Sequence, residues 1–270
     1  MSRAPEPALD VLTVVAASVL VYATALITHE LAHALVGLAL GGEPTLVSST
    51  DTRGDWSSLG ERDVLLVGIS GSAVNGFVAL MSWLLFRRQV GRPRTLALAA
   101  WLGFAIGAWI PVSYLVVSPI FGFGDWTTIV DQFPNRGPLR ASLAVTGLFV
   151  AGLLWKETKS SLARLVGNGS SADRTSRARR IVRAAWIAGG SVAVVAALFS
   201  PLDPRWAVGI AAGSTFGTTW PVLRAVDAVA ETPVPGAPLV VRRSWVVVVL
   251  GAAAGAALVG IFGPGLRLAG

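Results

Sequence analysis

The chain contains two histidines, and both lie in one five-residue segment, His29-Glu30-Leu31-Ala32-His33. Residues four apart share one face of a helix, so both imidazoles can reach a single Zn²⁺ at about 2.0–2.1 Å. Glu30 then projects beside the ion, where its carboxylate can take a proton from a zinc-bound water and later return it to the leaving amine. The spacing therefore predicts a hydrolytic zinc site with His29 and His33 as ligands and Glu30 as the general base.

The alternative is a helix that carries two histidines only for packing or hydrogen bonding. The segment lies within an apolar stretch that runs from about residue 8 to residue 40. Ionisable groups in an apolar span cost free energy and are usually retained for a pathway, a pair or a metal. The setting therefore favours metal binding.

The composition is that of a membrane protein, because 53% of the residues are hydrophobic, 14% are charged and the mean hydropathy is +0.66. Segments long enough to cross about 30 Å of hydrocarbon lie near residues 8–40, 63–86, 95–118, 139–155, 181–200, 205–223 and 244–263. We predict an all-α, polytopic transmembrane helical bundle of six to seven spans, a multi-pass protein of the cell membrane. The segment 205–223, rich in Gly, Ser and Thr, suits either a packed interior helix or a re-entrant one.

The first apolar stretch has some features of a secretory signal, since Arg3 precedes it and Ala23-Thr24-Ala25 resembles a cleavage site. The stretch is longer than the hydrophobic region of a signal and continues through the histidine motif. We therefore expect it to be the first span.

Most of the 22 Lys and Arg residues lie at the N-terminus and in residues 87–94, 156–183 and 224–243. The positive-inside rule then predicts a cytoplasmic N-terminus and, with seven spans, an external C-terminus. We interpret residues 156–183 as a basic, flexible linker that can contact anionic lipid, between a metalloprotease-like core at 1–138 and C-terminal helices at 139–270. With no soluble basic domain, nucleic acid is not an expected partner.

A catalytic zinc needs a third protein ligand. The chain has no further histidine and no cysteine, which also excludes disulfides and a cysteine nucleophile. The third ligand must therefore be a carboxylate. We predict Asp125, which follows the third span, with Asp131 as the second candidate. If the first span runs outward, its C-terminal half and the loop after the third span lie at the same membrane face. The alternative role for Asp125 is to cap a helix that begins at Trp126.

These features together resemble the site-2 protease family of intramembrane zinc metalloproteases, over roughly residues 20–135. In that family a Gly-x-x-x-Asn element of the second core helix is implicated in substrate handling, and Gly71-Ser72-Ala73-Val74-Asn75 is similar to it. The resemblance implies that Asn75 binds substrate. An interhelical hydrogen bond is the alternative role for this side chain.

The chain departs from the family in two respects. Gly124-Asp125-Trp126 stands where the family has Leu-Asp-Gly. The family usually places its metal near the cytosol, whereas the distribution of Lys and Arg puts the histidine half of the first span outside.

Residues 43–62 correspond in position to a short extended segment that is thought to offer a strand to substrates in the family. Residues 45–50 have β propensity and residues 54–56 offer a turn. A strand edge would hold an unfolded peptide by main-chain hydrogen bonds, although an ordinary solvated loop is equally compatible with the sequence.

The predicted function is that of a zinc metalloendopeptidase that cleaves a membrane protein or peptide substrate within the lipid bilayer. Water must reach the zinc, so we expect polar residues such as Thr24, Thr28, Ser70 and Ser72 to line a wet cavity, unless their hydroxyls only bond to their own helices. The alternatives are a catalytically inactive relative and a metal or proton transporter. A transporter should show further carboxylates along a path, and the later spans contain almost none. The sequence leaves the substrate and the oligomeric state open.

Overall fold

The protein is a bundle of membrane-spanning helices in the computed structural model, which describes residues 9–89, 95–122, 124–232, 234 and 236–268. Six described helices are long and apolar enough to cross a bilayer. They are α1 (Val11–Ala39), α2 (Glu61–Gln89), α3 (Thr95–Phe121), α5 (Arg136–Val166), α6 (Ser171–Ala197) and α9 (Trp245–Ala257), which continues as a π-helical turn, η2 (Leu258–Phe262). The predicted all-α, multi-pass bundle is therefore confirmed.

The segment predicted at 205–223 crosses the bundle as an interrupted helix. It consists of α7 (Pro204–Ala212), a π-helical turn η1 (Gly213–Gly217) and α8 (Trp220–Ala228). The crossing begins near Ser200, whose hydroxyl lies 3.1 Å from that of Thr50. It ends near Thr232, whose carbonyl accepts a hydrogen bond from Arg174 at the start of α6. The described chain thus passes seven times between the two ends of the bundle, six times as a continuous helix.

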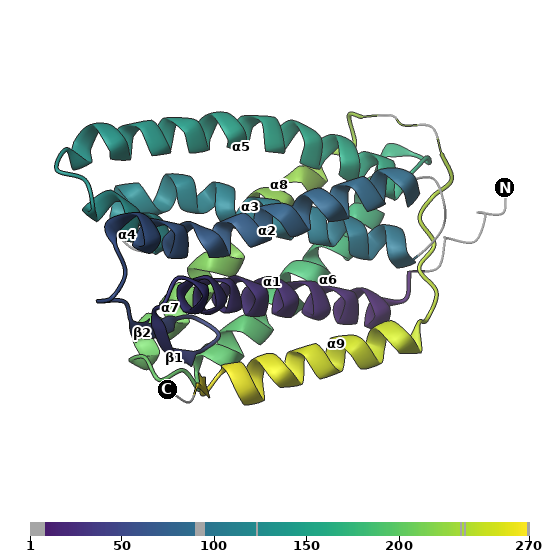
Figure 1. The fold of residues 1–270 in the computed structure, drawn as a ribbon. Helices are drawn as coiled ribbons and strands as arrows, with labels where there is room; N and C mark the ends of the chain where they lie inside the picture. Colours follow the sequence, from purple (N-terminus) through teal and green to yellow (C-terminus); the bar gives the residue numbers. More distant parts are fainter. Residues whose placement is uncertain (1–8, 90–94, 123, 233, 235, 269–270) are drawn as a thin grey trace, which may run out of the picture.

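The two ends of the described chain lie at opposite ends of the bundle (Figure 1). Leu9 forms a β-bridge with Val241 at one end. Leu266 pairs with Val47 at the other. Arg3, which the sequence places before the first span, lies outside the described residues.

A small antiparallel sheet follows α1 and has the strand order β2-β1-β3. Its strands are β1 (Glu43–Val47), β2 (Thr52–Asp55) and β3 (Leu266–Arg267). The extended segment predicted after the first span is therefore present. Its reversal lies at residues 48–51, however, and not at 54–56, because Gly54 and Asp55 pair with β1.

The basic stretch at 156–183 is helical and is not a flexible linker. Helix α5 continues to Val166, four residues form the loop, and α6 begins at Ser171. The stretch stays helical because its apolar residues recur at helical spacing and are buried. These residues are Leu162, Leu165, Val166, Ala178, Ile181 and Val182.

Helix α1 lies in the middle of the bundle and packs closely against α6 and α9. Glycines permit the close approach, because a Cβ at Gly251 of α9 would overlap the backbone at Ala16. A Cβ at Gly189 of α6 would overlap the ring of Tyr22 in the same way. The sequence predicts a core at 1–138 and separate C-terminal helices at 139–270. The largest hydrophobic cluster contains residues of both segments, so the two share one core.

Candidate metal centre

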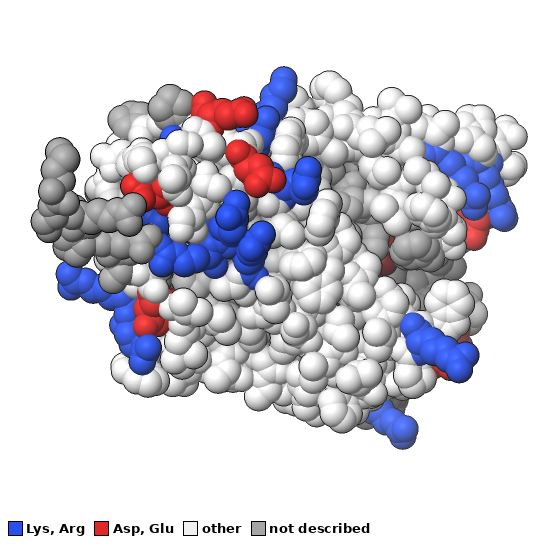
Figure 2. Space-filling model, turned by 180° about the vertical axis from the view of Figure 1, so that it is seen from behind, with Lys and Arg blue, Asp and Glu red and all other residues white. Residues whose placement is uncertain are grey.

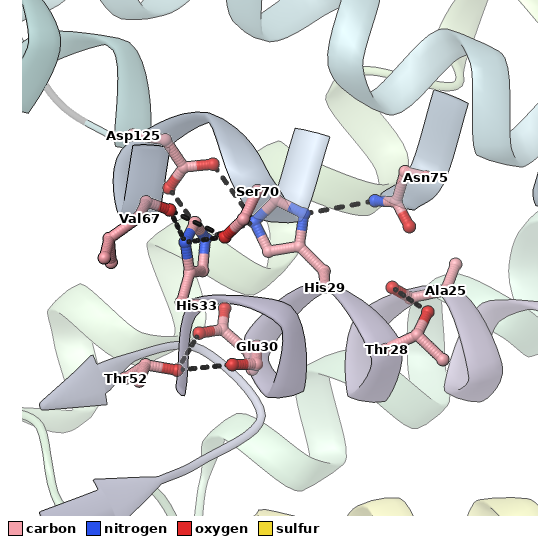
Figure 3. A network of polar contacts seen from close by, with 10 residues as sticks. All are labelled: Ala25, Thr28, His29, Glu30, His33, Thr52, Val67, Ser70, Asn75 and Asp125. Atoms are coloured by element: carbon pink, nitrogen blue, oxygen red, sulfur yellow. Dashed lines mark hydrogen bonds and ion pairs between the residues drawn. The ribbon is translucent and has the colours of Figure 1, made fainter. Parts of the chain in front are cut away.

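The two histidines project from the C-terminal half of α1 toward α2 and α4 (Asp125–Asp131), as Figure 3 shows. Both side chains are buried, and their rings meet edge to face with centroids 4.9 Å apart. The Nε2 atoms of His29 and His33 lie 3.3 Å from each other. The helical spacing predicted from the sequence therefore brings both nitrogens to one point.

Asp125 approaches this point as the first residue of α4. Its Oδ2 lies 3.1 Å from Nε2 of His29, and its Oδ1 lies 3.6 Å from Nε2 of His33. Gly124, with a φ of 80°, makes the turn that leads into α4, and no side chain caps this helix. Asp125 thus faces the histidines instead of capping a helix. The second candidate, Asp131, is exposed and forms an ion pair with Arg136.

The three side chains form a group that can hold a metal ion, since their ligand atoms all lie within 4.8 Å of one another. Nδ1 of His33 lies 2.7 Å from the carbonyl oxygen of Val67, which can only accept a hydrogen bond. Nδ1 therefore carries a proton, and Nε2, which faces Asp125, is the nitrogen that can bind a metal. Oδ2 of Asp125 is buried and has no hydrogen-bond partner among the described residues other than Nε2 of His29. Acceptor atoms gathered in this way fit a cation between them.

Asn75 lies beside His29 and not in the cavity. Its side-chain amide is 3.2 Å from Nδ1 of His29, and its Oδ1 is buried without a partner. A 180° turn of the amide would let Oδ1 accept from Nδ1–H and would leave Nε2 of His29 free to bind a metal. The contact supports a role for Asn75 in orienting His29, while its role in binding substrate stays a prediction.

Thr52 of β2 holds the carboxylate of Glu30. Its hydroxyl lies 2.8 Å from Oε2 of Glu30 and 3.0 Å from the backbone carbonyl of the same residue. The hydroxyl can donate to only one of these oxygens at a time. This contact was not predicted from the sequence, because it depends on the reversal that returns β2 to α1.

A cavity of about 990 Å³ lies against the two histidines, Glu30 and Asp125. The other polar side chains that line it come from the turn before β2, from α3, from α4 and from the interrupted crossing. They are Thr50, Asp51, Thr52, Ser113, Tyr114, Thr128, Ser214 and Thr218. A cavity at the site was predicted, but these lining residues were missed.

None of the four hydroxyl residues expected from the sequence is among those that line the cavity. Thr28 donates to the carbonyl of Thr24 within α1. Ser70 donates to Val67 and lies 3.2 Å from Nδ1 of His33, so it belongs to the surroundings of the histidine. Ser72 is buried, and its hydroxyl has no hydrogen-bond partner among the residues that the structure describes.

Comparison of the chain with protein-family models, curated proteins and solved structures found no match. The resemblance to the site-2 protease family therefore rests on the residues named above.

Proposed function

We propose that the chain is an intramembrane zinc metalloendopeptidase. The observation that supports this most strongly is the convergence of two imidazoles and one carboxylate, with Glu30 beside them, on a cavity among membrane-spanning helices. Two His and one carboxylate with room for a fourth group is the ligand set of a hydrolytic zinc site. His29, His33 and Asp125 would hold the ion.

Zinc, when bound, would polarise a carbonyl oxygen and lower the pKa of a water to about 7. Glu30 would accept the proton of the attacking water and return it to the leaving amine. Thr52 would keep the Glu30 carboxylate in place by donating a hydrogen bond to it. The carbonyl of Val67 and the amide of Asn75 would fix the two imidazole rings.

The substrate would be a peptide segment in an extended conformation, because a helix shields its own carbonyls. Strand β2 lies at the edge of the sheet and carries Thr52, which contacts Glu30. A peptide that pairs with this edge would run beside the general base. The lipid bilayer and a membrane protein or peptide are the partners of this proposal.

A transporter would need ionisable side chains along a path through the bundle. Apart from the two histidines, the buried acidic or basic side chains among the described residues are Arg174 and Arg177, both near the start of α6. The ionisable groups at the cavity thus form one local cluster, which favours local chemistry.

The test uses detergent-purified protein with two probes, an unfolded fluorophore-labelled casein and a single-span membrane peptide. Wild type loaded with zinc should cleave at least one probe. Glu30→Gln should keep its zinc and lose cleavage, while Glu43→Gln, a change at an exposed residue of β1, should leave both unchanged. Cleavage by Glu30→Gln would reject the role of Glu30. Zinc-loaded wild type that cleaves neither probe would favour a catalytically inactive protein.

A further inference from the structure

Charged side chains gather at the two ends of the bundle, and a band with few charges lies between them (Figure 2). One end, which we call the basic end, carries many more basic than acidic side chains. Its described basic residues are Arg87, Arg88, Lys156, Lys159, Arg164, Arg174, Arg177, Arg179, Arg180, Arg183, Arg224, Arg242 and Arg243. Its described acidic residues are Asp10, Glu157, Asp173, Asp227 and Glu231.

The opposite end, which we call the metal end, has the reverse balance. Its basic residues are Arg53, Arg62, Arg136, Arg140, Arg205 and Arg267. Its described acidic residues are Glu30, Glu43, Asp51, Asp55, Glu61, Asp63, Asp125, Asp131 and Asp203. Loops rich in Lys and Arg stay in the cytoplasm, so the positive-inside rule places the basic end there. The metal end, at the opposite end of the membrane-spanning helices, then lies on the other side of the membrane.

All elements that surround the cavity meet at the metal end. They are the C-terminal half of α1, β2 with the turn before it, the start of α2, the end of α3, the short α4 and the first half of the interrupted crossing. The cavity reaches exposed residues of two of these elements, Thr128 of α4 and Trp206 of α7, and also the exposed Gly124 just before α4. Water and peptide therefore have a path to the histidines from the metal end.

We infer that the metal cavity opens to the non-cytoplasmic side of the membrane, so that its substrates are polypeptide segments presented at that face. This inference rests on the proposed function for its substrate class. A suitable substrate would be an exported or membrane-anchored chain whose cleaved segment lies in the outer half of the bilayer. The general base and its water would then work in contact with the external medium.

The absence of cysteine from the chain allows a direct test with single cysteines. Ser57→Cys marks the metal end and Ser176→Cys marks the basic end, and both residues are exposed. Gly209→Cys marks the cavity itself, because Gly209 lines it and an added Cβ there would meet nothing within 4 Å. Each variant is treated with a membrane-impermeant maleimide in sealed right-side-out vesicles, in inverted vesicles and after detergent.

Ser57→Cys and Gly209→Cys should react in right-side-out vesicles as fully as in detergent, and Ser176→Cys should react only in inverted vesicles or in detergent. The reverse pattern, or equal reaction from both sides, would overturn the orientation. Protection of Gly209→Cys in right-side-out vesicles, while Ser57→Cys reacts, would overturn the opening of the cavity. If a marker fails to react in detergent, a second exposed residue replaces it: Asn135→Cys at the metal end or Glu231→Cys at the basic end. Labelling depends on neither zinc nor cleavage. The inferred orientation can therefore be wrong while the proposed function is right, and the proposed function can be wrong while the orientation is right.

Discussion

Gly71 of α2 packs so closely against His33 that a Cβ on residue 71 would lie 2.5 Å from Nε2 of the imidazole. The same Cβ would lie 2.7 Å from Nε2 of His29. A side chain on this residue would therefore occupy the space in front of both nitrogens. Only glycine lets α2 pass this close to the candidate ligands.

Gly71→Ala should therefore remove zinc from the purified protein while the protein stays helical, because the added methyl group displaces the imidazoles. Gly76→Ala is the matched control, since a Cβ at residue 76 of the same helix would meet nothing within 4 Å. Zinc per protein is measured by mass spectrometry and helix content by circular dichroism. A full complement of zinc in Gly71→Ala would show that the metal does not sit between these rings.

The candidate ligands can be tested in the same way. Wild type should contain close to one zinc per chain. His33→Ala should lose it and Asp125→Ala should retain much less, because a catalytic zinc site needs all three protein ligands. Asp131→Ala serves as the control, since Asp131 is exposed and pairs with Arg136. If Asp125→Ala keeps its zinc, the third ligand lies elsewhere.

Asn75 should affect the affinity for zinc through His29. Asn75→Leu keeps the side-chain size but removes the hydrogen bond to Nδ1, and we expect zinc affinity to fall by about 10–100-fold. Asn75→Asp keeps an acceptor at this position and should recover most of the affinity. Competition with a zinc chelator measures both. Equal affinities for wild type and Asn75→Leu would assign the contact to helix packing alone.

The contact of α9 with α1 predicts a change in stability away from the metal. Gly251→Ala should lower the free energy of unfolding by about 1–3 kcal/mol, because its methyl group would press on the backbone at Ala16. Gly152→Ala in α5 faces open space and should leave stability equal or raise it by up to about 1 kcal/mol. Thermal unfolding in detergent, at constant zinc, distinguishes the two. A Gly251→Ala protein as stable as wild type would contradict the close packing.

Local rules were enough to predict how His29, Glu30 and His33 share one helix, because four-residue spacing fixes a common face. The approach of Asp125 followed from counting spans, since alternate crossings return the chain to the same membrane face. The contacts of Val67, Asn75 and Thr52 with these side chains depend on how α2 and β2 pack against α1. Those packing details are set by side-chain shape and could not be predicted from one sequence.

The basic stretch at 156–183 shows why composition alone misled the prediction. Its many charges resemble those of a solvated linker, yet Leu162 and Val166, like Ala178 and Val182, repeat at helical spacing and are buried. The 3.6-residue period was therefore the better guide in this stretch.

The interrupted crossing puts a break in helical geometry among the membrane-spanning helices, next to the cavity. Lipid tails offer no hydrogen bonds, so a carbonyl freed by a break needs another donor. Four hydroxyls in the break donate to carbonyls three or four residues earlier. They belong to Ser214, Thr215, Thr218 and Thr219. These hydroxyls thus give the backbone carbonyls of Ala211, Ser214 and Thr215 a hydrogen-bond donor from within the break, where the surrounding lipid could supply none.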